Sequence, residues 1–239
     1  MCSISYSGYN PRSLALIVHV NEPVTLIGGA AVTKARINRA VALAPGVVAA
    51  DGGADAALDH GVTPDAVIGD FDSISPEALD SIPGDRLHRI EEQESTDFDK
   101  CLRSIRAPLV IGIGFSGDRL DHALAAYNTL VRMPGRRCIL LGAEELVFLA
   151  PPSLSLDLEA GTRVSLFPMG AVEGVSDGLE WPINGLNFSP DGRVGTSNAA
   201  TGTVHMSVTA PKMLVILPEH TLEAVVRALL TTTGLWPGE

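Results

Sequence analysis

Two aspartates follow a short apolar run, in the segment Gly69-Asp70-Phe71-Asp72-Ser73 after Ala66-Val67-Ile68. If a strand continues through this segment, Asp70 and Asp72 project from the same face, because strand side chains alternate. Two carboxylates about 6 Å apart repel by roughly 3 kcal/mol at an effective dielectric constant near 20, so we expect a cation between them. Mg²⁺ shared with the phosphates of a ligand fits, because it takes one or two carboxylates plus phosphate oxygens. The alternative is a turn whose aspartates cap the helix that begins near Ser75.

A further aspartate and two glycines follow another apolar run. Asp51, Gly52 and Gly53 come directly after the predicted strand Val47–Ala50. Ligands of open parallel sheets bind at the edge formed by the carboxyl ends of the strands, so the sequence puts another carboxylate at such an edge. An ordinary strand-to-helix turn remains the alternative, because glycine favours turns as well.

A third acidic segment leads into a predicted helix, Asp97–Arg106. Its apolar residues recur at helical spacing and form one stripe: Phe98, Cys101, Leu102 and Ile105. Thr96 and Asp99 fit a capping box, so Asp99 is interpreted as structural. Asp97 gains from the helix dipole at the first helical position. Lys100 lies off the stripe and could contact a phosphate, although a solvated lysine is the commoner outcome.

A G-x-G-x-x-G pattern, Gly112–Gly117, stands between a predicted strand and a predicted helix. A dinucleotide fingerprint also needs an acidic residue about 20 residues further on, and the sequence has Arg136 and Arg137 in that region. Arg119 and its neighbours Asp121 and His122 are stronger candidates for a functional site than the glycine pattern, because an arginine binds phosphate oxygens through two parallel N–H groups. The alternative is salt bridging among these three residues on the surface.

Two polar segments stand out later in the chain. Trp181-Pro182 offers an indole, whose face attracts an organic cation by about 0.5 to 2 kcal/mol, although the indole could equally be packed in the core. Gly195-Thr196-Ser197-Asn198 supplies small polar side chains.

The order of apolar segments predicts two domains that differ in the spacing of their apolar residues. Residues 1–150 alternate short apolar runs with helical patterns, which is typical of an α/β domain with a mainly parallel, Rossmann-like sheet. The runs are Leu14–Val20, Val24–Ile27, Val47–Ala50, Ala66–Ile68, Leu109–Ile113 and Cys138–Leu141, and a second helix is predicted over residues 118–133 with the stripe Leu120, Leu124, Tyr127 and Val131. Residues 151–239 change to alternation with period two, as at Leu154, Leu156 and Leu158, which favours an all-β domain, a sandwich or partial barrel. Residues 219–231 have a helix-forming composition.

Composition narrows the class of protein further. The 239 residues include 46% hydrophobic and 19% charged side chains, which is enough apolar material for a large core. A net charge of -11 repels nucleic acid. Apolar runs are far shorter than the ~18 residues of a membrane span, and no secretory signal is recognised. Three scattered cysteines indicate neither disulfides nor a zinc site, so we expect a cytoplasmic protein.

Six motifs in one order resemble the thiamine pyrophosphokinase family. They are DGGA at 51–54, GDFDS at 69–73, STDFDKCL at 95–102, GDRLDH at 117–122, GLEWPING at 178–185 and GTSN at 195–198. The resemblance implies a homodimeric, Mg²⁺-dependent enzyme that transfers diphosphate from ATP to the hydroxyl of thiamine, giving thiamine diphosphate and AMP. It also implies an N-terminal nucleotide-binding domain and a C-terminal thiamine-binding domain.

The resemblance also implies a role for each matching residue. The expected catalytic residues are Asp70, Asp72, Asp97, Lys100, Arg119 and Asp121, with Asp70 and Asp72 holding Mg²⁺ and Asp97 orienting or deprotonating the hydroxyl. The expected nucleotide-binding residues are Asp51, Gly52, Gly53, Ser73, Thr96 and His122. The expected thiamine-binding residues are Gln93, Trp181, Ser197 and Asn198. Asp118 replaces a glycine common in the family, and Glu94 replaces a commoner aspartate.

Two other functions stay open at this point. A phosphatase of the haloacid dehalogenase type would use the Asp70-x-Asp72 motif as its nucleophile motif, but that motif is usually on the first strand and here two or three strands precede it. A nucleotide or thiamine sensor without turnover would keep the pocket, although binding alone needs few of the residues Asp70, Asp72, Asp97 and Lys100.

Overall fold

The computed structural model describes residues 16–117 and 119–237. The start of the predicted strand at Leu14 and the residue Asp118 lie outside the described residues. No helix among the described residues is both long and apolar enough to cross a membrane.

The first half contains two groups of parallel strands. One is β2 (Val24–Ile27), β7 (Val110–Ile113) and β8 (Cys138–Leu141), and the other is β3 (Gly46–Ala50), β4 (Ala66–Gly69) and β5 (Leu87–Arg89). A bridge between Val24 and Pro45 places the start of β3 beside β2. All the residues of β2, β4, β7 and β8 are buried, as expected of parallel strands covered on both faces. A short parallel pair joins β1 (Val18–His19) to β6 (Ile105–Arg106).

Helices connect these strands. They are α1 (Lys34–Leu43), α2 (Gly53–Asp59), α3 (Pro76–Ser81), the 3₁₀ turn η2 (Gly84–Arg86), α4 (Asp97–Ser104) and α5 (Leu120–Arg132). The predicted α4 stripe is confirmed, because Phe98, Cys101 and Leu102 are all buried. Thr96 caps α4 as predicted, since its Oγ1 accepts a hydrogen bond from Asp99 N (3.3 Å).

The predicted stripe of α5 is wrong in its first half. Leu120 is 70% exposed and Leu124 is 53% exposed. The helix instead buries Ala123, Ala126 and Leu130. Small side chains let the helix approach the sheet closely, so the buried stripe is rotated relative to the one that the larger apolar residues predict.

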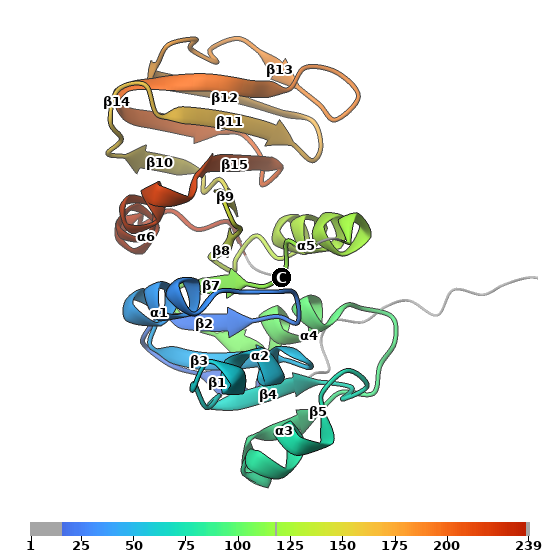
Figure 1. Ribbon diagram of the computed structural model, residues 1–239. Coiled ribbons are helices and arrows are strands. Elements are labelled where there is room, and N and C mark those ends of the chain that lie inside the picture. Colours follow the sequence, from blue (N-terminus) through green and yellow to red (C-terminus); the bar gives the residue numbers. More distant parts are fainter. Residues whose placement is uncertain (1–15, 118, 238–239) are drawn as a thin grey trace, which may run out of the picture.

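The second half consists mainly of antiparallel strands. They are β9 (Glu145–Leu149), β10 (Ser153–Leu156), β11 (Arg163–Pro168), β12 (Val172–Leu179), β13 (Asn187–Phe188), β14 (Gly195–Val208) and β15 (Met213–Pro218). The long β14 pairs with β11 through its first residues and with β10 and β12 further along. Figure 1 shows β10 to β14 at one end of the molecule and α3 at the other, with β8 and β9 between them.

Hydrogen bonding continues from one half to the other. β8 pairs with β9, β9 with β15, and β15 with β11, so that β2, β7 and β8 belong to the same ten-stranded mixed sheet as the strands of the second half. The structure therefore contains a mixed sheet with helices, in which strands of both halves take part.

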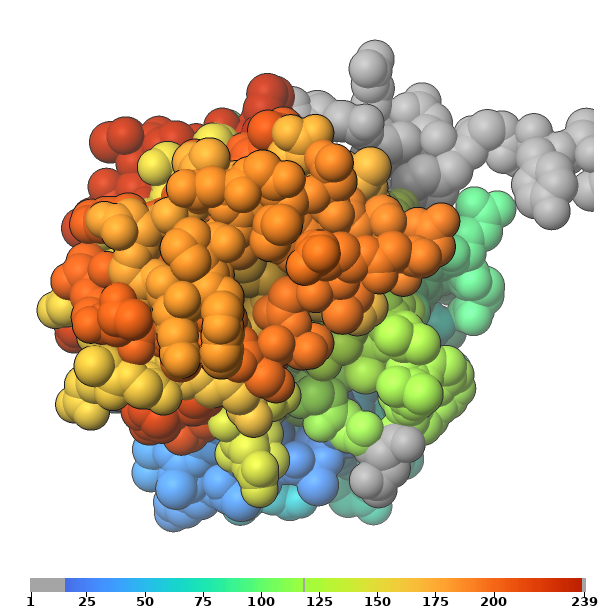
Figure 2. Space-filling view, turned by 90° about the horizontal axis from the view of Figure 1, so that it is seen from above, coloured from blue at the N-terminus to red at the C-terminus, as the bar shows by residue number. Residues whose placement is uncertain are grey.

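The predicted C-terminal helix is also present, as the turn η3 (Glu219–Thr221) followed by α6 (Leu222–Thr231), so the second half does not consist of strands alone. Figure 2 looks down on that half, whose yellow to orange segments cover most of this face.

Candidate active site

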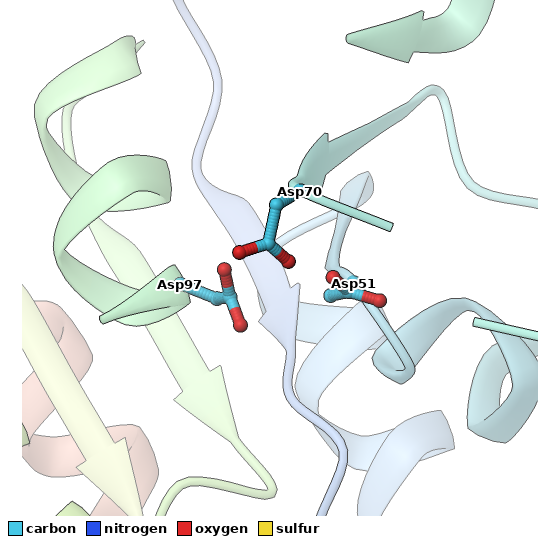
Figure 3. A group of neighbouring side chains, drawn as sticks. All are labelled: Asp51, Asp70 and Asp97. Atoms are coloured by element: carbon cyan, nitrogen blue, oxygen red, sulfur yellow. The ribbon is translucent and has the colours of Figure 1, made fainter. Parts of the chain in front are cut away.

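Three carboxylates meet where elements of the first half end or begin. Asp51 directly follows β3, Asp70 directly follows β4, and Asp97 is the first residue of α4. One carboxylate oxygen of each lies within 4.8 Å of the others. Figure 3 shows that the carboxylates of Asp70 and Asp97 are turned toward one another and that Asp51 lies beside Asp70. The parallel strands therefore bring Asp51 and Asp70 to one sheet edge, as the sequence predicts, and the start of α4 adds Asp97.

Asp51 holds the loop that follows β4. Its Oδ2 accepts a hydrogen bond from Phe71 N (2.8 Å), and its Oδ1 accepts one from Ser73 N (3.2 Å). Asp51 and Phe71 both have left-handed backbone conformations, with φ of 44° and 66°. Such strain costs of order 1–3 kcal/mol for each residue, and the two hydrogen bonds help to offset it. Asp51 thus determines the shape of the Asp70–Ser73 loop.

Asp70 and Asp72 do not project from one face of a strand, which corrects that expectation. β4 ends at Gly69, so the strand does not continue through Asp70 and Asp72. Asp72 is exposed, and its Oδ1 accepts a hydrogen bond from Ser73 Oγ (2.8 Å). The carboxylates brought together are those of Asp51, Asp70 and Asp97. The alternative in which these aspartates cap the next helix is also wrong, because Ser75 Oγ caps α3 by accepting from Ala78 N (3.1 Å).

The cation within the acidic cluster is Lys100. Its side chain is only 2% exposed, so the alternative of a solvated lysine is wrong. Lys100 Nζ lies 3.1 Å from Asp70 Oδ2 and 3.0 Å from Asp97 Oδ1. Burial opposes its charge, but hydrogen bonds to Asp97 and Asp70 outweigh that cost and raise the pKa of Lys100. The ammonium group therefore stays charged between the two carboxylates.

The pKa values of the neighbouring carboxyl groups, Asp51 and Asp70, are shifted in opposite directions. Burial, followed by the neighbouring Asp70 and Asp97, raises the pKa of Asp51 to about 6, although the amides of Phe71 and Ser73 act against this. Burial also opposes ionisation of Asp70, but hydrogen bonds from Lys100 and Gln93, together with the neighbouring Asp51, lower the pKa of Asp70 to about 2. At neutral pH the Asp70 carboxylate is therefore charged.

The cluster fits a divalent cation. Asp70 Oδ1 is buried and has no hydrogen-bond partner among the described residues, whereas its Oδ2 accepts from both Lys100 and Gln93. An ionised carboxylate oxygen without a donor is costly to bury, and hard oxygen ligands are those that Mg²⁺ takes. The Asp51 and Asp97 oxygens nearby offer further ligands.

Gln93 and Thr96 contact this region through the segment before α4. Gln93 Nε2 donates a hydrogen bond to Asp70 Oδ2 (2.7 Å). Gln93, expected to contact thiamine, therefore contacts the acidic cluster in this structure. The Thr96 side chain is engaged in capping α4.

The two predicted glycines lie in the contact between loops. A Cβ at Gly53 would lie only 2.1 Å from the carbonyl oxygen of Ile27, so no other residue fits there without a shift of the backbone. A Cβ at Gly52 would lie 3.1 Å from the carbonyl oxygen of Ser73. These positions let α2 begin close to β2 and to the Asp70 loop.

The glycine-rich segment after β7 also serves packing. Gly114 has a φ of 76°, and a Cβ there would lie 2.6 Å from the carbonyl oxygen of Gly28. The turn is therefore explained by close contact with the loop after β2, which leaves the dinucleotide fingerprint without a separate role.

Arg119, Asp121 and His122 lie at the start of α5 and are exposed. Arg119 Nη2 pairs with Asp121 Oδ2 (2.7 Å), and Arg119 Nε donates to Asp121 Oδ1 (3.2 Å). The pairing of Arg119 with Asp121 is the surface salt bridge that the sequence offers as the alternative. Among residues 16–117 and 119–237, neither of them hydrogen-bonds to the acidic cluster.

The predicted thiamine-binding residues of the second half lie together. Trp181 and Asn198 line a cavity of about 180 Å³ with Phe188, and the indole is 58% exposed. Asn198 is buried: its Oδ1 accepts from Trp181 N (3.1 Å), and its Nδ2 donates to Trp181 O (2.7 Å). The Asn198 amide thus holds the backbone of Trp181. Ser197 is exposed and has a left-handed φ of 63°.

Sequence reasoning missed two residues beside the acidic cluster. Glu92, the residue before Gln93, forms an ion pair with Arg103. They are eleven residues apart, so no local pattern reveals their contact. A partial signal does exist, because Asp99 and Arg103 have the i, i+4 spacing of a helical ion pair and lie 3.1 Å apart.

The chain thus combines an acidic site at the edge of parallel strands with an antiparallel half that carries an aromatic cavity. Two domain models of one family match these parts in order: the catalytic domain of thiamin pyrophosphokinase matches residues 37–140, and its vitamin B1 binding domain matches residues 153–213. The chain belongs to the thiamin pyrophosphokinase family.

Relatives and solved structures agree with this assignment. Thiamine pyrophosphokinase 1 of Oryza sativa subsp. japonica is 29% identical over 154 residues, which cover 56% of this chain and 58% of the relative. Thiamine pyrophosphokinase 1 of Arabidopsis thaliana is 28% identical over 162 residues, covering 59% of this chain and 60% of the relative. The chain thus spans about three fifths of the length of these curated relatives.

Solved structures show the same fold. Thiamin pyrophosphokinase from Candida albicans has a TM-score of 0.70 and 18% identity over 83% of this chain and 88% of that one. The yeast enzyme has a TM-score of 0.69 and 17% identity over 95% of this chain and 96% of that one.

Proposed function

We propose that the chain transfers a diphosphoryl group from ATP to the hydroxyl of thiamine, giving thiamine diphosphate and AMP. The hydroxyl oxygen attacks the β-phosphorus, and the bond from that phosphorus to the oxygen of the departing AMP breaks. Such a transfer needs in-line positioning and neutralised phosphate charge more than covalent chemistry. The observation that carries the proposal is the buried Asp70 Oδ1 without a partner, in a cluster that also contains Lys100.

The acidic cluster is proposed to hold Mg²⁺ together with the nucleotide phosphates. Asp70 is the main ligand, with Asp97 and Asp51 within reach of the same ion. Asp72 is proposed as a second ligand from the exposed loop, next to the phosphates. The ion would supply charge neutralisation to the triphosphate. Lys100 uses two of its three N–H donors on Asp70 and Asp97, so one remains for a phosphoryl oxygen.

Asp97 is proposed to orient or deprotonate the thiamine hydroxyl. Its side chain is 36% exposed, whereas that of Asp70 is 11% exposed, so Asp97 is the more accessible of the two. Arg119, oriented by Asp121, is proposed to clamp phosphate oxygens with both N–H groups. Gly52, Gly53, Ser73, Thr96 and His122 are proposed to border the nucleotide.

The aromatic cavity is proposed to receive thiamine. The thiazolium ring is a cation, and the exposed Trp181 indole offers it a π face. Asn198 holds Trp181 in place, while Ser197 and Gln93 are proposed to contact the substrate. Phe188 adds an apolar wall.

We also propose a division of labour between two domains. Residues 1–150 form a Rossmann-like nucleotide-binding domain, and residues 151–239 form a β-sandwich or partial barrel for thiamine.

A homodimer is proposed as well, because Leu120 and Leu124 leave an apolar surface on α5. Light scattering should then give twice the monomer mass. Two free, buried cysteines, Cys101 and Cys138, are consistent with a cytoplasmic location.

The test is a reaction of the purified chain with Mg²⁺, ATP and thiamine. AMP and thiamine diphosphate should form together, and AMP should form only when thiamine is added. Asp70→Asn and Asp72→Asn should abolish both products while the far-ultraviolet circular dichroism stays unchanged. Glu91→Gln is the matched control, because it removes one negative charge from an exposed ion pair.

Two results would overturn the proposal. Phosphate release without thiamine would indicate a phosphatase of the haloacid dehalogenase type, which the family assignment does not favour. Thiamine binding without any AMP would indicate a sensor.

A further inference from the structure

A network of charged side chains lies behind the loop that carries Gln93. This loop, residues 90–96, joins β5 to α4 and is called the Gln93 loop here. Glu92 forms an ion pair with Arg103 of α4 and accepts a hydrogen bond from Ser95 Oγ (2.6 Å). Arg103 Nη1 also donates to Ser95 Oγ (3.1 Å). One guanidinium group thus holds the loop at two of its residues.

The same arginine is itself held from the other side. Its side chain is 9% exposed, and its Nη1 lies 3.1 Å from Asp99 Oδ1. Asp99 is buried, and its Oδ2 accepts from Arg132 Nη1 of α5 (2.8 Å). The loop is therefore attached through Arg103 to both α4 and α5. Charge-assisted hydrogen bonds of this kind are stronger than neutral ones, and the low exposure of Arg103 protects them from screening.

The attached loop reaches the acidic cluster through a single side chain. Gln93 follows Glu92 directly, and its Nε2 donates to Asp70 Oδ2 (2.7 Å). That bond, with the one from Lys100, occupies Oδ2 and leaves the buried Oδ1 to a cation. Groups that hydrogen-bond a metal ligand fix its orientation, and their loss typically weakens metal binding 10- to 100-fold. The residues of the loop before α4 form no helix or strand, so the side-chain network is what fixes their position.

We propose that Glu92 is a positioning residue for the cation site. Its ion pair with Arg103 holds the Gln93 loop so that the Gln93 amide keeps the Asp70 carboxylate oriented toward the ion. Glu92 acts through Gln93 and touches neither ion nor substrate. The inference rests on the proposed function for the purpose of the ion, and it concerns binding of the ion itself.

The test is a double-mutant cycle on the full chain, with Glu92→Gln, Gln93→Ala and the double variant. The affinity for Mn²⁺ alone is measured by electron paramagnetic resonance, and the unfolding midpoint is measured for each variant. We expect Mn²⁺ to bind about tenfold more weakly to Gln93→Ala than to the parent chain. For Glu92→Gln we expect binding that is weaker by at least about threefold. The double variant should bind no more weakly than Gln93→Ala, because Glu92 has nothing left to position.

Glu91→Gln provides the matched control. It removes the same charge one residue away, from an exposed pair in which Arg89 Nε and Glu91 Oε1 are 3.7 Å apart, and it should leave Mn²⁺ affinity unchanged. The proposal is overturned if Glu92→Gln binds Mn²⁺ like the parent chain. It is also overturned if the two substitutions act additively, if Glu91→Gln has the same effect, or if the parent chain binds no Mn²⁺.

The two proposals can fail separately. A parent chain that binds Mn²⁺ in the expected cycle but makes no AMP with thiamine refutes the proposed function and leaves this inference standing. If the parent chain makes AMP with thiamine but Glu92→Gln leaves the affinity for Mn²⁺ unchanged, this inference is refuted and the proposed function stands.

Discussion

Replacing Lys100 by methionine tests whether its ammonium group balances the buried carboxylates. Asp70 loses its main cationic partner, while the long apolar stem is kept. The Asp70 pKa of about 2 against an ordinary value of 3.8 corresponds to about 2.5 kcal/mol at 1.36 kcal/mol per pKa unit. Gln93 supplies part of this, and the cost of burying the lysine charge is relieved. We therefore expect Lys100→Met to lower the free energy of unfolding by about 2 kcal/mol at pH 7, below the 3–5 kcal/mol of a fully buried pair.

The same variant also predicts how much Mg²⁺ stabilises the folded chain. In the variant the ion meets Asp70 and Asp97 without having to compete with the ammonium group. At a concentration about 100 times its dissociation constant, a ligand of the folded state stabilises by roughly 2.7 kcal/mol, so Mg²⁺ should restore most of the loss. The parent chain should gain less from the same addition.

Urea unfolding with and without Mg²⁺ is the assay, and Lys34→Met, which changes an exposed lysine, is the control. The reasoning fails if Lys100→Met is as stable as the parent chain, or if Mg²⁺ stabilises both equally.

Three further predictions follow from the same geometry. Because the folded-state pKa of Asp51 is raised to about 6, its contribution to stability increases as pH falls from about 6 toward 4, and Asp51→Asn should remove that increase in urea unfolding. Because the pKa of Asp70 is lowered to about 2, its contribution is present above pH 4 and lost as pH falls toward 2, and this loss should be absent from Asp70→Asn. Asn198→Ala should raise KM for thiamine by up to about 30-fold, because two hydrogen bonds that hold Trp181 are lost at roughly 1 kcal/mol each, about 2 kcal/mol in all. An unchanged KM in steady-state kinetics would contradict this role.

Local patterns predicted those parts of the fold that depend on local physics. β2 and β8 have the predicted bounds, Val24–Ile27 and Cys138–Leu141, because a short apolar run between polar turns has one good solution in a buried sheet. The capping of α4 by Thr96 is equally local. The α5 stripe failed because close packing selected Ala123 and Ala126 over the larger leucines, and that choice depends on the partner surface.

The site was predictable in its residues but only partly in its contacts. Parallel strands bring Asp51 and Asp70 to one edge, so their proximity follows from topology. The direction in which Asp72 points does not, because Asp51 bends the loop through the amides of Phe71 and Ser73, twenty residues away in sequence. The burial of Lys100 could not be inferred either, since α4 presents it to the Asp70 carboxylate, which comes from another segment.

The C-terminal segment shows why the two halves act as one structure although their sequence patterns differ. Arg39 of α1 forms ion pairs with Glu219 of η3 and Glu223 of α6, and Trp236 Nε1 donates to Ala150 O at the end of β9 (2.8 Å). The segment after β15 therefore connects the last strands to a helix of the first half. Because β9 and β15 also continue the sheet from β8, a movement of one half against the other would break sheet hydrogen bonds and the half-buried ion pairs of Arg39 together. The acidic cluster and the Trp181 cavity are thus carried on one continuous framework, so a substrate that bridges the two within one chain would find their spacing already set.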